Sequence, residues 1–138
     1  MIRDHGRGML VAGSLLAALG VGLGAYGAHG LSSTLEALGR QENLAQRLAW
    51  FETAVRYQMF HALGLLIMGV WQKVTPNRWL PRAGVCLLVG VFLFCGCLQV
   101  MTFAGPPWRK LGAIVPLGGL SLILSWLAAM LAAWQSES

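Results

Sequence analysis

The spacing of the charged residues constrains this chain more than any other feature of its sequence. Ten Lys and Arg and five Asp and Glu are distributed over 138 residues, and none falls within four long segments: residues 8–35, 57–72, 83–108 and 111–136. An unpaired charge in the middle of a bilayer costs several kcal/mol on most scales. Long apolar segments without charge are therefore typical of helices that cross a membrane.

Three of these four segments are long enough to cross a bilayer. About 20 apolar residues, rising 1.5 Å each, cover roughly 30 Å of hydrocarbon. Residues 57–72 are too few, so their helix must begin upstream and bring Arg56 and Glu52 to the membrane interface. The composition agrees, because 57% hydrophobic residues, 11% charged residues and a mean hydropathy of +0.64 are far outside the range of ordinary water-soluble proteins.

The expected fold is all-α, an integral membrane four-helix bundle that forms a single membrane domain over residues 1–138. The expected spans are residues 8–29, 49–72, 83–103 and 111–133. Between the first two spans, residues 31–48 interleave polar side chains with leucines at helical spacing, which predicts an amphipathic interfacial helix. The first apolar run is longer than the core of a secretion signal, so we expect it to be retained as a span.

The first expected span is rich in glycine. Gly20 and Gly24 stand four residues apart and Gly27 follows, an arrangement that lets another backbone approach one face closely. The sequence does not say whether that partner helix belongs to this chain. Residues 22–27 also form a G-x-G-x-x-G string, but a dinucleotide site needs a preceding strand and an acidic residue about 20 positions later. We therefore reject a dinucleotide site.

The second expected span carries a polar face into the membrane. Glu52 and Arg56 stand four residues apart with the acid first, an order that favours a pair at the interface. Around the expected helix His61 falls between Tyr57 and Gln58, while Glu52 and Arg56 point to roughly the opposite side. The simpler interpretation of His61 is a neutral side chain that bonds a carbonyl or a tyrosine, and the alternative is a ligand-binding or proton-carrying role.

The third expected span contains all the cysteines and one strongly polar residue. Cys95 and Cys97 lie about 200° apart around a helix, so their sulfur atoms diverge and no metal site is predicted. We expect the cysteines to act as small buried hydrophobic residues. Gln99 lies deep in the span, and we expect it to hydrogen-bond another helix.

The fourth expected span follows a proline-rich turn in which Trp108 stands beside two cations, a composition typical of a membrane interface. Pro116, Gly118 and Gly119 interrupt its first half. Proline frees a carbonyl group and glycine allows close contact between helices, so this pattern predicts a kink and close packing.

Orientation depends on how Lys and Arg are distributed between the two sides of the membrane. The count is equal on both sides, and the loop at residues 73–82 is the most basic short loop. By the positive-inside rule, we expect this loop and both termini in the cytoplasm. The net charge of +5 predicts contact with anionic lipid rather than nucleic acid, because no soluble basic surface exists to hold a duplex.

Three strings of the sequence resemble those of a known family: GAYGAHGL at residues 24–31, FETAVRYQMFHAL at residues 51–63 and LGAIVPLGG at residues 111–119. Over nearly its whole length the chain is similar to domain-of-unknown-function family 423, which comprises small bacterial membrane proteins of the YgdD and YwdK type and small mitochondrial relatives. It departs from the family pattern at Tyr26, at Val115 and in the Trp108-Arg109-Lys110 string. The resemblance implies a four-helix membrane fold in the bacterial inner membrane, without an established activity, substrate or cofactor.

The resemblance also indicates which residues could form a functional site. Motif positions fall at His29, Glu52, Arg56, Tyr57, Gln58 and His61, and at Pro116 with the glycines beside it. Our structural hypothesis is that His29 and His61 converge with Tyr57 and Gln58 in one polar pocket, which the kink at Pro116 closes.

Three classes of function stay open. The first is a non-enzymatic accessory or assembly protein whose glycine faces contact other membrane proteins or a second copy. The second is a small carrier, channel or small-molecule binder that uses a polar pocket around His29 and His61. A membrane enzyme is the least favoured class, because the sequence offers no nucleophile with a base, no metal-ligand cluster and no pair of catalytic carboxylates. We predict no catalytic residue, metal or cofactor.

Overall fold

The structure, a computed structural model, describes residues 2–135 and is built from helices. In chain order the elements are α1 (Ile2–His29), α2 (Leu31–Ala37), α3 (Leu44–Val74), α4 (Trp79–Phe103), the 3₁₀ helix η1 (Pro106–Ala113) and α5 (Val115–Gln135). No β-strand occurs between residues 2 and 135, which confirms the all-α class.

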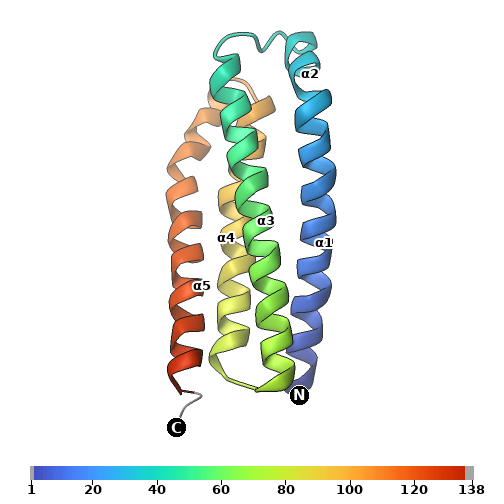
Figure 1. The fold of residues 1–138 in the computed structure, drawn as a ribbon. Helices are drawn as coiled ribbons and strands as arrows, with labels where there is room; N and C mark the ends of the chain where they lie inside the picture. Colours follow the sequence, from blue (N-terminus) through green and yellow to red (C-terminus); the bar gives the residue numbers. More distant parts are fainter. Residues whose placement is uncertain (1, 136–138) are drawn as a thin grey trace.

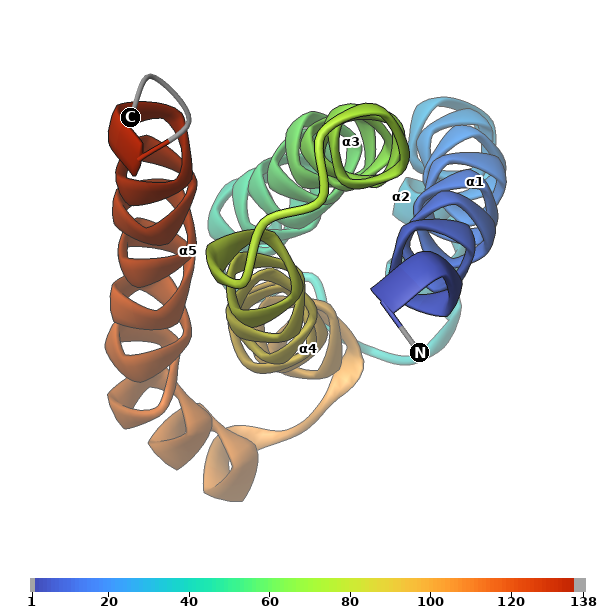
Figure 2. The same cartoon turned by 90° about the horizontal axis from the view of Figure 1, so that it is seen from below.

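The four long helices stand side by side as a rod, with α2 and η1 at one end and both chain termini at the other (Figure 1). α3 packs on α1 and on α4, and α5 packs on α4. Seen from below, the helices follow one another as a curved row in the order α1, α3, α4, α5 (Figure 2). The core includes Leu65 and Met68 of α3 and Leu87 of α4, all of them buried.

Three segments are long and apolar enough to cross a membrane: Gly6–His29, Trp79–Phe103 and Pro106–Gln135. The long helix α3 is not among them. It has 31 residues, but Arg47, Glu52 and Arg56 lie in its first half and Lys73 in its last turn. Length and composition thus support three of the four expected spans, and the charged residues of α3, together with Gln58, His61 and Gln72, lower its mean hydropathy.

All four long helices begin at residues other than the starts of the expected spans; α1 begins at Ile2 rather than at residue 8, and α3 at Leu44 rather than at residue 49. α4 begins at Trp79 rather than at residue 83, because Pro81 is tolerated in the first turn, where its missing N–H has no acceptor. α5 begins at Val115 rather than at residue 111, because the preceding residues form η1. Pro116 therefore lies in the first turn of α5. The expected interruption of this span is a change from the 3₁₀ helix η1 to the α-helix α5, and it lies before Pro116.

A row of glycines spaced seven residues apart joins α1 to α3: Gly6, Gly13, Gly20 and Gly27. A Cβ atom at Gly13 would lie 3.0 Å from the carbonyl oxygen of Ala62, and one at Gly20 would lie 2.5 Å from Sδ of Met59. A seven-residue period keeps the same face of α1 against α3 when two helices coil around each other in a left-handed sense. The partner of this glycine face is therefore a helix of the same chain.

The remaining glycines of the expected packing set differ in their surroundings. A Cβ at Gly24 would make an ordinary contact with Val55 at 3.7 Å. On α5, a Cβ at Gly118 would overlap the backbone nitrogen of Phe94 and lie 2.9 Å from its Cα, whereas one at Gly119 would lie 3.8 Å from the Phe94 ring. Gly118 is thus a position at which α4 and α5 approach too closely for a side chain.

The amphipathic helix expected over residues 31–48 is divided in two. The first part forms α2, which buries Leu31 and Leu35, and residues from 44 onward belong to α3. Gly39 has a φ of +66°, and its N–H donates to the carbonyl of Glu36, which is a common way for a helix to end at glycine. The connection is therefore a short helix followed by a turn.

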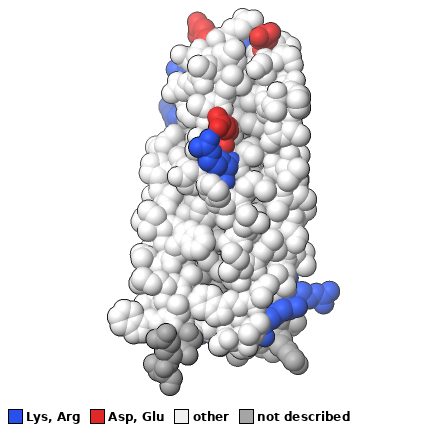
Figure 3. Space-filling view, viewed as in Figure 1, with Lys and Arg blue, Asp and Glu red and all other residues white. Residues whose placement is uncertain are grey.

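Most of the charged side chains lie towards the two ends of the rod. On the face shown in Figure 3, acidic atoms stand at the top, one cluster of acidic and basic atoms lies in the upper half, basic atoms lie at the lower right, and uncharged surface covers the middle. Large apolar side chains are exposed on the long helices, among them Phe60, Ile67 and Phe92. Such a surface is typical of helices in contact with lipid.

Candidate functional site

A set of hydrogen bonds crosses the middle of the molecule and links all four long helices. We call it the polar network, and its side chains are those of Gln58, His61, Gln99 and Trp126. Gln58 and His61 come from α3, Gln99 from α4 and Trp126 from α5. The polar face expected on the second span therefore points into the fold for Gln58 and His61.

His61 is buried and uses both ring nitrogens. Nε1–H of Trp126 donates to Nε2 of His61 at 3.2 Å, and Nδ1 of His61 lies 2.7 Å from the carbonyl oxygen of Tyr57. Since Nε2 accepts a hydrogen bond, the ring proton is assigned to Nδ1, which donates to that carbonyl. His61 is thus a neutral imidazole with two partners, which corresponds to the simpler interpretation of the sequence.

Gln58 extends the polar network to the other two helices. Its Nε2 donates to the carbonyl oxygen of Leu16 on α1 at 2.9 Å, and its Oε1 accepts from Nε2 of Gln99 at 3.3 Å. Gln99 therefore bonds another helix, as its position in the sequence predicts. Hydrogen bonds of this kind fix how helices are aligned where lipid offers no hydrophobic driving force.

Aromatic rings enclose the histidine. The Tyr57 ring stacks near His61 with 6.0 Å between ring centroids and contacts the Phe94 ring at 4.8 Å. The indole of Trp126 reaches α3 because Gly64 leaves room for it, since a Cβ at Gly64 would lie 2.9 Å from the indole ring. The polar network is consequently packed on several sides, and its arrangement fits a structural role better than a ligand site.

A second feature is an open groove of about 440 Å³ between α1, α2 and the first half of α3. Gly24 and Gly27 form part of its wall, together with the ion pair of Glu52 and Arg56. Both side chains of the pair are well exposed, at 70% and 58%. The pair is therefore solvated or interfacial, and the groove is the place where these predicted site residues meet.

The structure separates His29 from the polar network. His29 is the last residue of α1 and is exposed. Gly13 of α1 is level with Ala62, the neighbour of His61, and His29 lies about 24 Å farther along α1 at 1.5 Å per residue. The two imidazoles therefore do not share one pocket, because the antiparallel helices place them at different depths.

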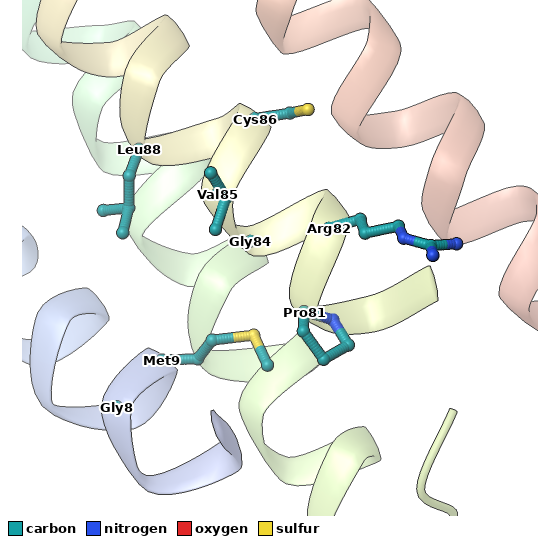
Figure 4. A pocket seen from close by; sticks show the side chains of 8 residues that line it. All are labelled: Gly8, Met9, Pro81, Arg82, Gly84, Val85, Cys86 and Leu88. Carbon is teal, nitrogen blue, oxygen red and sulfur yellow. The ribbon is translucent and has the colours of Figure 1, made fainter. Parts of the chain in front are cut away.

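A larger cavity of about 510 Å³ opens between α1 and α4 near the chain termini. Figure 4 shows the side chain of Met9 reaching from α1 towards Pro81 and Gly84, while Arg82 and Cys86 extend on the far side, towards α5. Apart from Arg82 its lining is apolar. The cavity can hold an apolar chain, but it offers no set of groups that would orient a polar ligand.

The cysteines have no metal-ligand geometry. Cys95 is buried, Cys86 and Cys97 are partly buried, and all are free. Over the described part of the chain, no group of three or more His, Cys, Asp or Glu could hold a metal ion.

Arg47 is a buried cation that the sequence did not single out. It is only 5% exposed, and its Nη1 lies 2.6 Å from the carbonyl oxygen of Thr102 and 3.1 Å from that of Ala104. Carbonyls at the carboxyl end of a helix lack intrahelical partners and carry partial negative charge, so Arg47 caps α4. No motif marks this role, because Arg47 stands among other polar residues of the connector.

Comparison with known families gives one match that covers most of the chain. The family model described as "Protein of unknown function (DUF423)" matches residues 23–119. This region contains the whole polar network except Trp126, together with the groove and Arg47.

Individual relatives match over nearly the whole chain. A UPF0382 membrane protein of Staphylococcus haemolyticus is 37% identical over 91% of this chain and 94% of its own length. The UPF0382 membrane protein YwdK of Bacillus subtilis is 35% identical over 90% and 94%, and the UPF0382 inner membrane protein YgdD of Escherichia coli is 30% identical over 92% and 89%. No solved structure matches the chain.

Proposed function

Because the chain belongs to the DUF423 family, and its relatives carry the name "membrane protein", we propose that it is a non-enzymatic accessory or assembly protein of the bacterial inner membrane. In this role its folded body presents a helix surface to another membrane protein. The observation that carries the proposal is the division of small residues on α1 between two faces.

One face of α1 is used within the chain, and the other is free to contact a partner. The seven-residue glycine row packs on α3, whereas Ser14, Ala18 and Gly22 lie four residues apart on the exposed side. A Cβ at Gly22 would have no atom within 4 Å. Small residues at this spacing allow a second membrane helix to approach closely.

The polar network supports the same proposal. Both nitrogens of His61 and both polar atoms of the Gln58 amide have partners inside the chain. A carrier or proton path needs polar groups that can exchange partners. Groups engaged in this way instead stabilise a rigid body, which is what a docking subunit needs.

Substitution of the free face tests the proposal. In a native-detergent pulldown followed by intact-mass analysis, we expect a stoichiometric membrane protein partner or a second copy with the natural chain, and its loss with Gly22→Leu. Gly96→Leu on α4 is the matched control, because a Cβ there also has no atom within 4 Å. Retention of every partner by Gly22→Leu would contradict the proposal.

The groove beside Glu52 and Arg56 favours a second candidate function, a small-molecule binder. Its volume of about 440 Å³ and its exposed ion pair are compatible with a small polar ligand. Mass analysis of the natively purified chain should then detect a bound small molecule, which Glu52→Gln with Arg56→Gln should remove. Glu36→Gln, outside the groove lining, should keep it.

We also propose that α3 is a fourth span, so that residues 1–138 form one four-span membrane domain with both termini in the cytoplasm. The length of α3 supports this, since 31 residues cover about 46 Å. Topology reporters at both ends separate the alternatives, because an even number of spans places the termini on the same side. With four spans, a green fluorescent protein fusion should fluoresce at either end, and alkaline phosphatase inserted near residue 41 should be active. Termini on opposite sides would indicate three spans.

A further inference from the structure

Two arginines from separate segments lie at the carboxyl end of α4, and a third follows in the next element. Arg47 of α3 donates to the carbonyl oxygen of Ala104. Arg40, which precedes α3, places two guanidinium nitrogens 3.4 and 3.6 Å from the position that a Cβ at Gly105 would occupy. Arg109 belongs to η1, four residues farther along the chain. The guanidinium groups of Arg47 and Arg40 thus lie beside the consecutive residues Ala104 and Gly105, and Arg109 follows in η1.

This group of cations has no acidic partner in the described structure. The ion pair found among residues 2–135 joins Arg56 to Glu52. Glu36 and Glu42 are exposed and form no ion pair with the described residues. The carboxyl end of a helix supplies about half a negative charge. Three guanidinium groups, each permanently protonated, exceed this by a wide margin.

The cations lie close enough to affect one another. Burial lowers the pKa of Arg47, and the charges of Arg40 and Arg109 lower it further. Repulsion among like charges in a partly buried place is unfavourable unless an anion compensates it.

Two of the arginines also hold buried N–H donors without an acceptor. The Nε atoms of Arg40 and Arg47 are buried and have no hydrogen-bond partner. Arg47 as a whole residue is only 5% exposed. A buried donor without an acceptor is unfavourable. An oxyanion would supply both the missing charge and the missing acceptors.

We propose that Arg40, Arg47 and Arg109 form a binding site for a phosphate group, carried by the headgroup of an anionic phospholipid. We call it the arginine site. The planar guanidinium group matches the geometry of phosphate oxygens. The position fits a lipid source, because Trp108 next to Arg109 is 56% exposed, and tryptophan beside cations marks the headgroup level of a membrane. Arg47 forms the buried floor of the arginine site, and Arg40 and Arg109 are its more accessible arms.

The arginine site can be tested with the full chain in detergent by native mass spectrometry. The probes are phosphatidylglycerol, cardiolipin and, as a zwitterionic reference, phosphatidylcholine. The variant Arg40→Gln with Arg109→Gln removes two arms and leaves the Arg47 cap in place. The control Arg78→Gln with Arg82→Gln removes the same charge at the other end of α4. We expect the first variant to lose roughly tenfold in affinity for the anionic lipids and the control to keep it.

A separate arm identifies the source of the phosphate. Inorganic phosphate is titrated into lipid-depleted protein, and into protein loaded with phosphatidylglycerol. Binding of inorganic phosphate that depends on Arg40 and Arg109, without any preference among lipids, would support the site and assign it to a soluble phosphate compound. Displacement of the lipid by inorganic phosphate would support a site open to both.

Two results would overturn the proposal. One is an equal loss of lipid binding in the two double variants, which would indicate unspecific attraction between charges. The other is full retention of binding by the Arg40 and Arg109 variant. The single variant Arg109→Gln is the control for misfolding, because the exposed Arg109 side chain lies outside the core. It should weaken anionic lipid binding while the thermal unfolding temperature stays unchanged.

Discussion

The indole N–H of Trp126 donates to Nε2 of His61 across 3.2 Å, which joins α5 to α3 although α4 stands between them in the row. We expect the pair to be coupled energetically. A double-mutant cycle of Trp126→Phe and His61→Phe should give a coupling energy of about 1 kcal/mol, the usual size for a hydrogen bond between membrane helices. Unfolding in mixed micelles, followed by circular dichroism, measures it. A coupling energy of zero would mean that the bond does not stabilise the fold.

Glycine positions on α1 should differ sharply in their tolerance of a methyl group. Gly13→Ala places a Cβ 3.0 Å from the carbonyl oxygen of Ala62, so we expect destabilisation by about 1–3 kcal/mol. Gly22→Ala meets no atom within 4 Å and should be neutral or stabilising, because alanine favours the helix. Thermal unfolding of the two variants in one detergent makes the comparison. Equal unfolding temperatures would show that α1 does not pack on α3 through the glycine row.

Removal of the Arg47 side chain should destabilise the fold. Arg47→Met leaves the terminal carbonyls of α4 without a buried cation, and we expect a loss of about 2–4 kcal/mol in the free energy of unfolding. Arg56→Met is the matched control, because its guanidinium is exposed and its ion pair is worth little. Denaturant titration of both variants gives the two values. Similar small losses would argue against a capping role for Arg47.

The three cysteines should differ in reactivity. Cys95 is 2% exposed, and Cys86 and Cys97 are only partly buried. In single-cysteine variants treated with N-ethylmaleimide in micelles, we expect Cys95 to react about tenfold more slowly, because labelling requires local opening of the helices. Denaturation should remove the difference. Fast labelling of Cys95 in the folded chain would show that the core around it is loose.

The charge-free segments predicted the helices well and their starts less well. α1 ends at His29 and α4 ends at Phe103, which are also the last residues of the first and third expected spans. The starts of α4 and α5 differ from the expected ones because a proline can occupy either the first turn of a helix or the segment before it. The local sequence does not decide between these two positions. The charge on α3 also weakened the prediction of a fourth span.

The candidate site was predictable in part. The sequence placed Gln58 and His61 on one polar face, and the pairing of Glu52 with Arg56 followed from their spacing. The distance between His29 and His61 could not be predicted from the sequence, since it depends on the relative depth of two antiparallel helices. The seven-residue spacing from Gly6 to Gly27 was visible in the sequence and could have indicated the face of α1 that meets α3.

The row order of the helices limits what a single copy can do. A closed ring of helices can surround a water-filled lumen, but in this curved row α1 and α5 stand at opposite ends and apolar core side chains fill the space between neighbouring helices. A hydrophilic solute that crossed the bilayer along this chain would need a second wall, supplied by another copy or by another protein. Any transport assay should therefore be read together with the stoichiometry of the complex.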